Sequence, residues 1–197
     1  MAITVTGPTT KDTSTVALGL AKILVGKSAD NIAEKEQVLD ETEDSLGALN
    51  STEFTSEVEY WRLTSGFPAM EDMSIPLSEV ARLDCEFKEI TPKNLAYARG
   101  IDATSGYGDA HSGEITLGNL SSPAFVRMEA IYTYPNATNH LYIIFPRANV
   151  TSSVNLAFAA EDNANVPVSI EAKRCDSGVS GGDAAWDNSP LGRIYFD

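Results

Sequence analysis

The sequence has few of the residues that most often carry out chemistry. Its 197 residues include only two cysteines and two histidines, and aromatic residues make up 8%. Cys85 and Cys175 lie far apart and lack the CxxC spacing of redox and zinc sites. We expect two reduced thiols in or near the core, with a disulfide as the alternative. No metal site and no cofactor are expected.

Basic residues are also scarce. The chain has 14 Lys and Arg against 28 Asp and Glu, which gives a net charge of −14. A chain this acidic does not hold DNA by neutralising phosphates. The excess charge either keeps the protein soluble through self-repulsion or forms a surface that repels polyanions.

Long apolar runs are missing as well. No run approaches the roughly 20 residues of a membrane span, so no membrane partner is expected. Residues 1–15 are polar and lack the charged start and apolar run of a signal peptide, which indicates a protein made in a cytoplasm. The hydrophobic content of 43% is enough for a packed core, and we expect a single domain over residues 1–197.

The first third of the chain predicts an arm, a strand and a connection. Residues 1–15 suit an extended N-terminal arm. Residues 16–26 are apolar and β-branched, which favours a strand, with a short helix as the alternative. The acidic segment 27–46 reads as a connection that could form a helical turn near residues 31–38.

Two long segments then alternate with period two. Residues 51–65 and 75–90 are predicted as strands, and they flank an exposed loop at residues 65–74. The loop residues of interest are Gly66, Phe67, Pro68, Met70, Glu71 and Asp72.

A short helix follows the second long strand. Thr91 is suited to the N-cap, Pro92 to the first turn, and Gly100 to the position just past the helix end. The remaining chain is turn-rich near residues 101–113 and then alternates again. Strands are predicted at residues 114–120, 124–134, 140–150, 152–160, 166–175 and 193–197, with a Gly-rich loop at 176–192. The expected fold is mainly β, an antiparallel β-sandwich or barrel with one short flanking α-helix.

Most of the negative charge is concentrated in one region. Residues 30–89 hold sixteen acidic and four basic residues, or −12 of the total −14. Within the two long strands, Glu57 and Glu59 share one face, and so do Asp84 and Glu86. Such acids are ordinary on a solvated face, but they would form an acidic wall if that face lined a channel.

The case for an enzyme is weak. His111 and His140 lie in polar, turn-rich surroundings typical of exposed loops. The segment GVSGG, residues 178–182, fits G-x-S-x-G, but no histidine follows Ser180 and no helix is predicted after it. We therefore expect no enzymatic activity.

Two segments carry a resemblance to a known family. LDCEFKEITPKNLAYARG, residues 83–100, resembles the strand and flanking helix of the major tail tube proteins of long-tailed bacteriophages. The matching positions are Glu89, Thr91, Asn94, Leu95, Ala96 and Gly100. Residues 144–175 resemble a late hairpin and strand of the same family. The two segments span 18 and 32 of the 197 residues, and the order of the predicted elements resembles the family over most of the chain, through degenerate motifs.

The resemblance implies a structural virion protein that self-assembles into stacked hexameric rings. Strands from each subunit would form a continuous β-barrel around a lumen that conducts viral double-stranded DNA without binding it. Lumen-facing acids would be Glu57, Glu59, Asp84 and Glu86, with Glu79 next, unless the register is shifted by one residue. The loop at residues 65–74 would stack rings, and the helix would cover the sheet from outside. Implied partners are tape measure, tail terminator and baseplate or initiator proteins, and the location is the virion tail.

Three alternatives stay open. The chain could be another β-sandwich virion protein, such as a tail terminator or head decoration protein. It could form the tube of a contractile tail or secretion system. It could also be a carbohydrate-binding module that uses Trp61, Trp186 and the tyrosines.

Overall fold

The computed structural model describes residues 19, 21–101, 113–115, 117–118, 123–135, 138–151, 154–156 and 165–197. The described strands are β1 (Lys22–Lys27), β2 (Leu49–Ser65), β3 (Met70–Phe87), β4 (Val126–Thr133), β5 (His140–Val150), β6 (Val166–Ala172) and β7 (Arg193–Phe196). The described helices are α1 (Pro92–Ala98) and the short 3-10 helix η2 (Ala184–Trp186). The prediction of a mainly antiparallel β fold with a short α-helix is confirmed.

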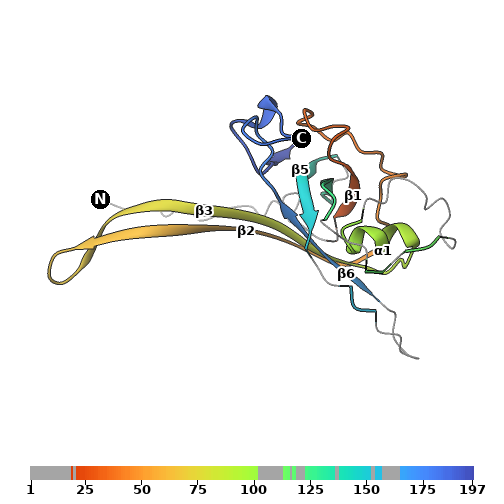
Figure 1. Cartoon of the computed structure of the whole chain (residues 1–197), viewed down its shortest axis with the longest axis horizontal. Coiled ribbons are helices and arrows are strands. Elements are labelled where there is room, and N and C mark those ends of the chain that lie inside the picture. The colour runs from red at the N-terminus through yellow and green to blue at the C-terminus, as the bar shows by residue number, and fades with distance from the viewer. Residues whose placement is uncertain are drawn as a thin grey trace, which may run out of the picture.

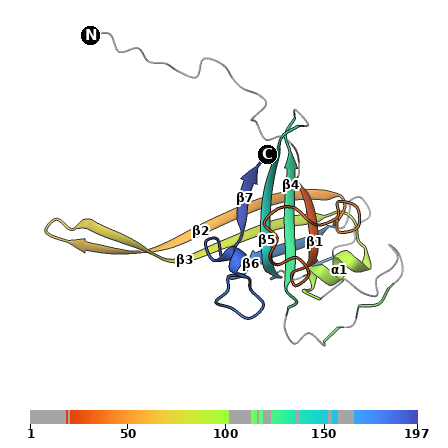
Figure 2. The same ribbon diagram turned by 90° about the horizontal axis from the view of Figure 1, so that it is seen from above.

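The strands form one seven-stranded sheet in the order β1-β4-β5-β6-β3-β2, with β7 paired to β5. Every strand pair is antiparallel. One edge of β5 is shared, since residues 141–144 pair with β7 and residues 148–150 pair with β6. The hairpin of β2 and β3 projects far beyond the other elements (Figure 1) and lies across the direction of β4, β5 and β7 (Figure 2).

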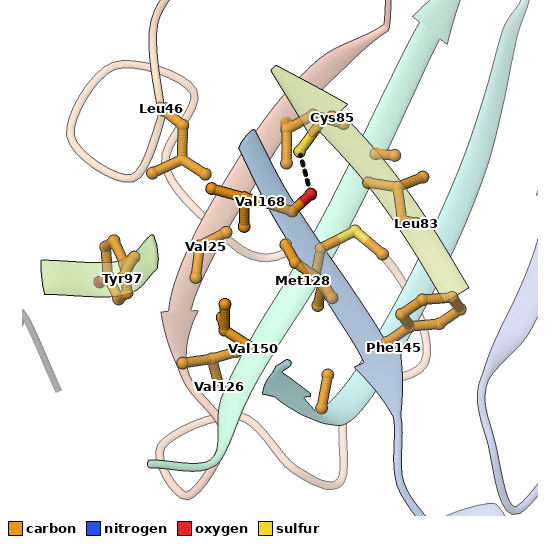
Figure 3. Close-up of a cluster of buried hydrophobic side chains, with 14 of the residues drawn as sticks. Val25, Leu46, Leu83, Cys85, Tyr97, Val126, Met128, Phe145, Val150 and Val168 are labelled. Carbon is orange, nitrogen blue, oxygen red and sulfur yellow. Dashed lines mark hydrogen bonds between the residues drawn. The ribbon is translucent and has the colours of Figure 1, made fainter. Parts of the chain in front are cut away.

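The core lies where the sheet folds across itself. Strands β1, β4 and β5 contribute one layer, and β3 and β6 contribute the other (Figure 3). On β6, and on β3 over residues 81–87, every second residue is buried, as expected for strands with one covered face. The central contacts include Val25, Met128 and Phe145 from the first layer, facing Leu83 and Val168 from the second.

Helix α1 closes one end of this core, and its boundaries follow the sequence. The Thr91 hydroxyl accepts a hydrogen bond from the Asn94 amide at 3.1 Å, Pro92 occupies the first turn, and Gly100 has a φ of +69°. Ala96, Tyr97 and Ala98 are buried in the core, while Leu95 packs at its margin. The predicted capping of this helix is confirmed, and the helix covers apolar core residues.

A strap, residues 31–39, covers the second face of β4. Seven of the eight residues of β4 are buried because the core covers one face and the strap covers the other. The charged residues Arg127 and Glu129 point toward the strap and are both 0% exposed. Arg127 donates to the carbonyls of Asn31, Glu34 and Glu36, and Glu129 accepts from the amides of Val38 and Leu39. The strap holds a single turn, in which the Glu34 amide donates to the Asn31 carbonyl at 3.1 Å, and is otherwise irregular, so the predicted helical turn is limited to residues 31–34.

Several strand predictions change in length. The strand predicted at 140–150 is confirmed as β5, and those at 124–134, 166–175 and 193–197 form shorter strands inside these ranges. The strand predicted at 75–90 begins earlier and ends at Phe87, and the strand predicted at 51–65 begins at Leu49. The described residues of 114–120 and 152–160 are not in strands. Of the segment 16–26, residues 22–26 form most of β1, while the N-terminal arm and His111 lie outside the described residues.

Candidate functional site

The outer half of the β2–β3 hairpin is the most unusual surface of the described chain. From Ser56 to Val80 every residue is exposed, including those on both strands. This segment includes ten large apolar side chains that remain in solvent: Val58, Tyr60, Trp61, Leu63, Phe67, Met70, Met73, Ile75, Leu77 and Val80. A lone two-stranded ribbon is marginally stable in water, and clustered exposed apolar residues mark interaction sites. The hairpin therefore has the properties of an assembly surface.

Both edges of this hairpin are free in the described part of the chain. Strand β2 pairs with β3 alone. Strand β3 pairs with β6 over residues 82–87, so its other edge is unpaired over residues 70–81. By contrast, the outer edge of β1 is covered, since Val25 donates to Asp44 and Leu46 donates to Ile23. Among the described strands, the long free edges are thus confined to the hairpin.

The turn of the hairpin is shorter than the predicted loop. Residues 66–69 form the turn, which we call the tip turn, and Met70, Glu71 and Asp72 already belong to β3. The prediction of a loop over residues 65–74 is therefore wrong in extent. Gly66 has a φ of +83°, which allows the chain to reverse in so few residues. Because β3 begins at Met70, the pairing of the two strands continues as far as Ser65 and Met70, close to Phe67, whose side chain is fully exposed.

The hairpin register places four of the five predicted acids on one face. Cross-strand pairing joins Glu53 with Asp84 and Ser51 with Glu86, while Glu57 and Glu59 follow at intervals of two along β2. The resulting acidic face comprises Glu53, Glu57, Glu59, Asp84 and Glu86. It is the face opposite the buried residues of β3, so it points away from the core of its own subunit.

Two details of this face differ from the sequence prediction. Glu79 pairs with Val58 and therefore lies on the other face, with the core-side residues. Glu53 was missed, although it lies four residues before Glu57 on the same strand, a spacing that places both side chains on one face. Within the face, Asp84 is paired with Arg82 at 2.8 Å and accepts a hydrogen bond from the Ser169 hydroxyl at 2.5 Å.

Beyond Glu59 the same face changes from acidic to apolar. Trp61 pairs with Ile75, and Leu63 pairs with Met73, on the side that carries Glu57 and Glu59 nearer the core. The change coincides with a β-bulge on β3 between the partners of Glu59 and Tyr60. One continuous ribbon therefore has an acidic root and an apolar outer half.

Residues considered for chemistry lie elsewhere and apart from one another. Cys85 and Cys175 are free and buried, which confirms the prediction of reduced thiols. Burial, with a smaller effect of the Asp84 charge, raises the pKa of Cys85 to about 12, and burial and Asp176 raise the pKa of Cys175 to about 11. Both thiols are thus protonated at neutral pH and are poor nucleophiles. The described residues hold no group of three or more metal-ligating side chains.

The GVSGG segment and Trp186 do not form sites either. Ser180 lies in a turn, and no α-helix follows it in the described chain, so a nucleophile elbow is not formed. Trp186 is 0% exposed and donates to the carbonyl of Ile32, so it is not available to stack on a sugar. No helix in the described part of the chain has the length and apolarity needed to cross a membrane.

Known proteins were compared with the chain. No protein-family model and no curated protein sequence matches it. Among solved structures, similarity is found to the sheath/tube terminator of an extracellular contractile injection system (PVC), with 10% identity, a TM-score of 0.48, and coverage of 92% of this chain and 96% of that chain. The PVC sheath–tube complex gives 12% identity and a TM-score of 0.43, covering 90% and 88% of the two chains. The anti-feeding prophage cap gives 10% identity and a TM-score of 0.44, covering 100% and 99%.

These solved structures are components of tube and sheath assemblies, and none is described as an enzyme. Two of the three are described as a terminator or cap.

Proposed function

We propose that the chain is a structural subunit of a tail-tube-type particle, and that its β2–β3 hairpins join into the wall of a closed ring. The observation that supports this most directly is the hairpin with two free edges and two exposed faces. Such a hairpin is stabilised when a neighbour pairs with it and buries its apolar side chains.

The two free edges belong to opposite sides of one hairpin, so they suit head-to-tail pairing. When β2 of one subunit pairs with the free part of β3 of the next, the strands alternate in direction and remain antiparallel. A contact between two different surfaces repeats from subunit to subunit and ends only when a ring closes. Closure leaves no free edge, and the resemblance described above implies six subunits per ring.

The acidic face then becomes the lining of the lumen. This face points away from the core of each subunit. In a ring whose subunit cores lie on the outside, Glu57, Glu59, Asp84 and Glu86 therefore face the lumen. An acidic lining repels phosphates and offers no release of counterions to hold DNA. A passage for viral DNA would need this property.

A tube terminator is the second candidate, because the same free edges would serve a subunit that forms one closing ring. The two candidates differ in whether rings of this chain add to one another. A tube subunit forms many stacked rings, whereas a terminator forms single rings that add to the end of a tube made by another protein.

Negative-stain electron microscopy of the concentrated full-length protein tests the proposal. Rings with a central hole are expected, and long tubes would identify the tube subunit. Single rings that do not grow would identify the terminator. Particles that stay monomeric at high concentration, and also after a tail initiator complex is added, would overturn the proposal.

A further inference from the structure

The two free edges of the hairpin differ in regularity. Over residues 51–65, β2 contributes one residue to every paired position, so its outer edge is a regular row of alternating N–H and C=O groups. The free part of β3, residues 70–81, is interrupted near its middle, because Leu77 is the extra residue of a β-bulge and Pro76 has no N–H. A second copy therefore offers β2 two different partners: its own β2 or the free part of its β3.

Pairing of β2 with a second β2 brings like charges together. Two copies related by a two-fold axis pair antiparallel and keep their acidic faces on one side of the joined sheet. The register that pairs all of residues 51–65 places Glu57 of each copy directly opposite Glu59 of the other. A shift of two residues in either direction places Glu57 or Glu59 opposite its own counterpart, and a shift of one residue turns the side chains to the wrong face. Like charges directly opposite each other on neighbouring strands are destabilising.

Pairing of β2 with β3 avoids this repulsion. The paired residues of the free part of β3 that share the side of Glu57 and Glu59 are all uncharged: Met70, Met73, Ile75, Ser78 and Val80. When hairpins lie side by side at one level, Val80 of the next copy lies opposite Glu57 and Ser78 lies opposite Glu59, as they do within one hairpin. There the Ser78 hydroxyl donates to the Glu59 carboxylate at 3.2 Å. A shift of the register within this edge exchanges one uncharged partner for another.

We infer that Glu57 and Glu59 determine the specificity of assembly, since they exclude the two-fold pairing of β2 with β2 and leave the head-to-tail pairing that closes a ring. The inference rests on the proposed function and gives these acids a role that does not depend on DNA. A two-fold dimer leaves only the two interrupted β3 edges free, and pairing between them meets Pro76 and Leu77 on both strands. The exclusion requires that both charges have the same sign, not that they are negative.

Residue 58 reports the two-fold pairing directly. In the register that pairs residues 51–65, the axis passes through Val58, so the thiols of Val58→Cys in two copies lie opposite each other at a separation that a disulfide spans. In a ring, the same residues of adjacent copies lie two strands, or about 10 Å, apart, which is too far. The native Cys85 and Cys175 are buried. Thr64→Cys is the matched control, because residue 64 lies opposite residue 52 in the two-fold register.

The test adds oxidised glutathione to Val58→Cys in several backgrounds and measures the disulfide-linked dimer by non-reducing electrophoresis. Glu57→Gln/Glu59→Gln should raise the dimer fraction roughly 2- to 30-fold, because two oppositions of like charge are removed. Glu57→Lys/Glu59→Lys should keep it low, because cations then oppose cations. A mixture of the Lys background with the unchanged background should raise it again, because opposite charges then face each other. Glu34→Gln/Glu36→Gln, at exposed strap positions, makes the same change in net charge and should have no effect.

The outcomes separate this inference from the proposed function. Equal dimer fractions in the Gln and unchanged backgrounds, or a high fraction with the Lys background alone, would overturn the inference. Ring formation is measured separately, by electron microscopy of the chain with residue 58 unchanged. Wild-type rings with no effect of Glu57→Gln/Glu59→Gln on cross-linking would leave the proposed function standing. Absence of rings in the wild type would overturn the proposed function itself.

Discussion

Asn94 holds helix α1 to two segments that are distant in sequence. Its side-chain amide donates to the carbonyls of Leu46 and Glu89, each at 2.9 Å, and the residue is 4% exposed. The Glu89 carboxylate accepts from the Ala48 amide at 2.9 Å, so a second side chain holds the connection between β3 and α1 to the segment before β2. These contacts give Glu89 and Asn94, two of the residues named in segment 83–100, a structural role. Both residues fix where the chain leaves β3 and enters the helix.

Asn94→Ala is expected to destabilise the fold by about 2 kcal/mol, because it leaves the buried Leu46 carbonyl and the partly buried Glu89 carbonyl without their donor. Urea unfolding at a concentration below assembly measures the change. Asn50→Ala is the control, since the exposed Asn50 side chain donates to the Glu86 carboxylate at the surface, and its effect should stay within about 0.5 kcal/mol. Equal effects of the two substitutions would show that Asn94 does not fix this junction.

The Arg127–Glu129 pair gives a second test at the residue scale. Its Nε–Oε1 distance is 2.6 Å, and each side chain also bonds the strap backbone. Arg127→Met leaves a buried carboxylate without its partner, so a loss of roughly 3–5 kcal/mol in unfolding free energy is expected. Lys22→Met, which breaks the exposed Lys22–Glu41 pair, should cost well under about 1 kcal/mol. A small loss for Arg127→Met would mean that the strap is held by its other contacts.

The elements that the sequence predicted best are those with a strong local signal. Alternation predicted β5 and the two hairpin strands, and N-cap, proline and glycine signals predicted α1. The hairpin turn was overestimated because Gly66 and Pro68 lie close together, although strand pairing resumes at Met70. The prediction for Glu79 is wrong, although alternation along the strand was enough to correct it: Glu79 lies five residues before Asp84 with no β-bulge between them, so the two side chains point to opposite faces.

The buried charges of β4 were missed for a related reason. Arg127 and Glu129 occupy the polar positions of an alternating strand, which normally face solvent. They are buried because the strap, distant in sequence, lies over them. A groove at the base of the hairpin, lined among others by Phe54, Ala81, Phe145 and Ile194, likewise joins residues of β2, β3, β5 and β7, and such long-range contacts leave no local signal in the chain.

The hairpin should be the least protected strand pair of the unassembled chain. Its outer half lacks buried neighbours on both faces, so local opening of its hydrogen bonds costs little. Hydrogen–deuterium exchange of the dissociated protein should show faster exchange in residues 56–65 and 70–80 than in β4 and β5. Assembly should slow exchange in the hairpin and change β4 little. Equal protection in both forms would argue against the hairpin as the assembly surface.

At the scale of the whole molecule, the chain combines a well-packed body with one element that is incomplete alone. The core and strap satisfy the strands of the body, including the edge of β1, whereas the hairpin keeps its free edges and apolar side chains for other copies. A net charge of −14 opposes association, so specific contacts must outweigh repulsion. Assembly should therefore be promoted by salt, which screens this repulsion.

The position of the acidic face in an assembly can be tested by reversing its charge. Glu57→Lys/Glu59→Lys places cations on the face that is proposed to line the lumen, so assembled rings should gain affinity for duplex DNA. That affinity should fall with a linear dependence of log K on log salt concentration. Glu34→Lys/Glu36→Lys is the matched control, because it makes the same change at exposed strap positions with the same spacing. DNA short enough to enter a ring should bind the hairpin variant, with density inside the hole by electron microscopy. Binding by both variants outside the hole would place the acidic face on the exterior, and the proposed lumen would be wrong.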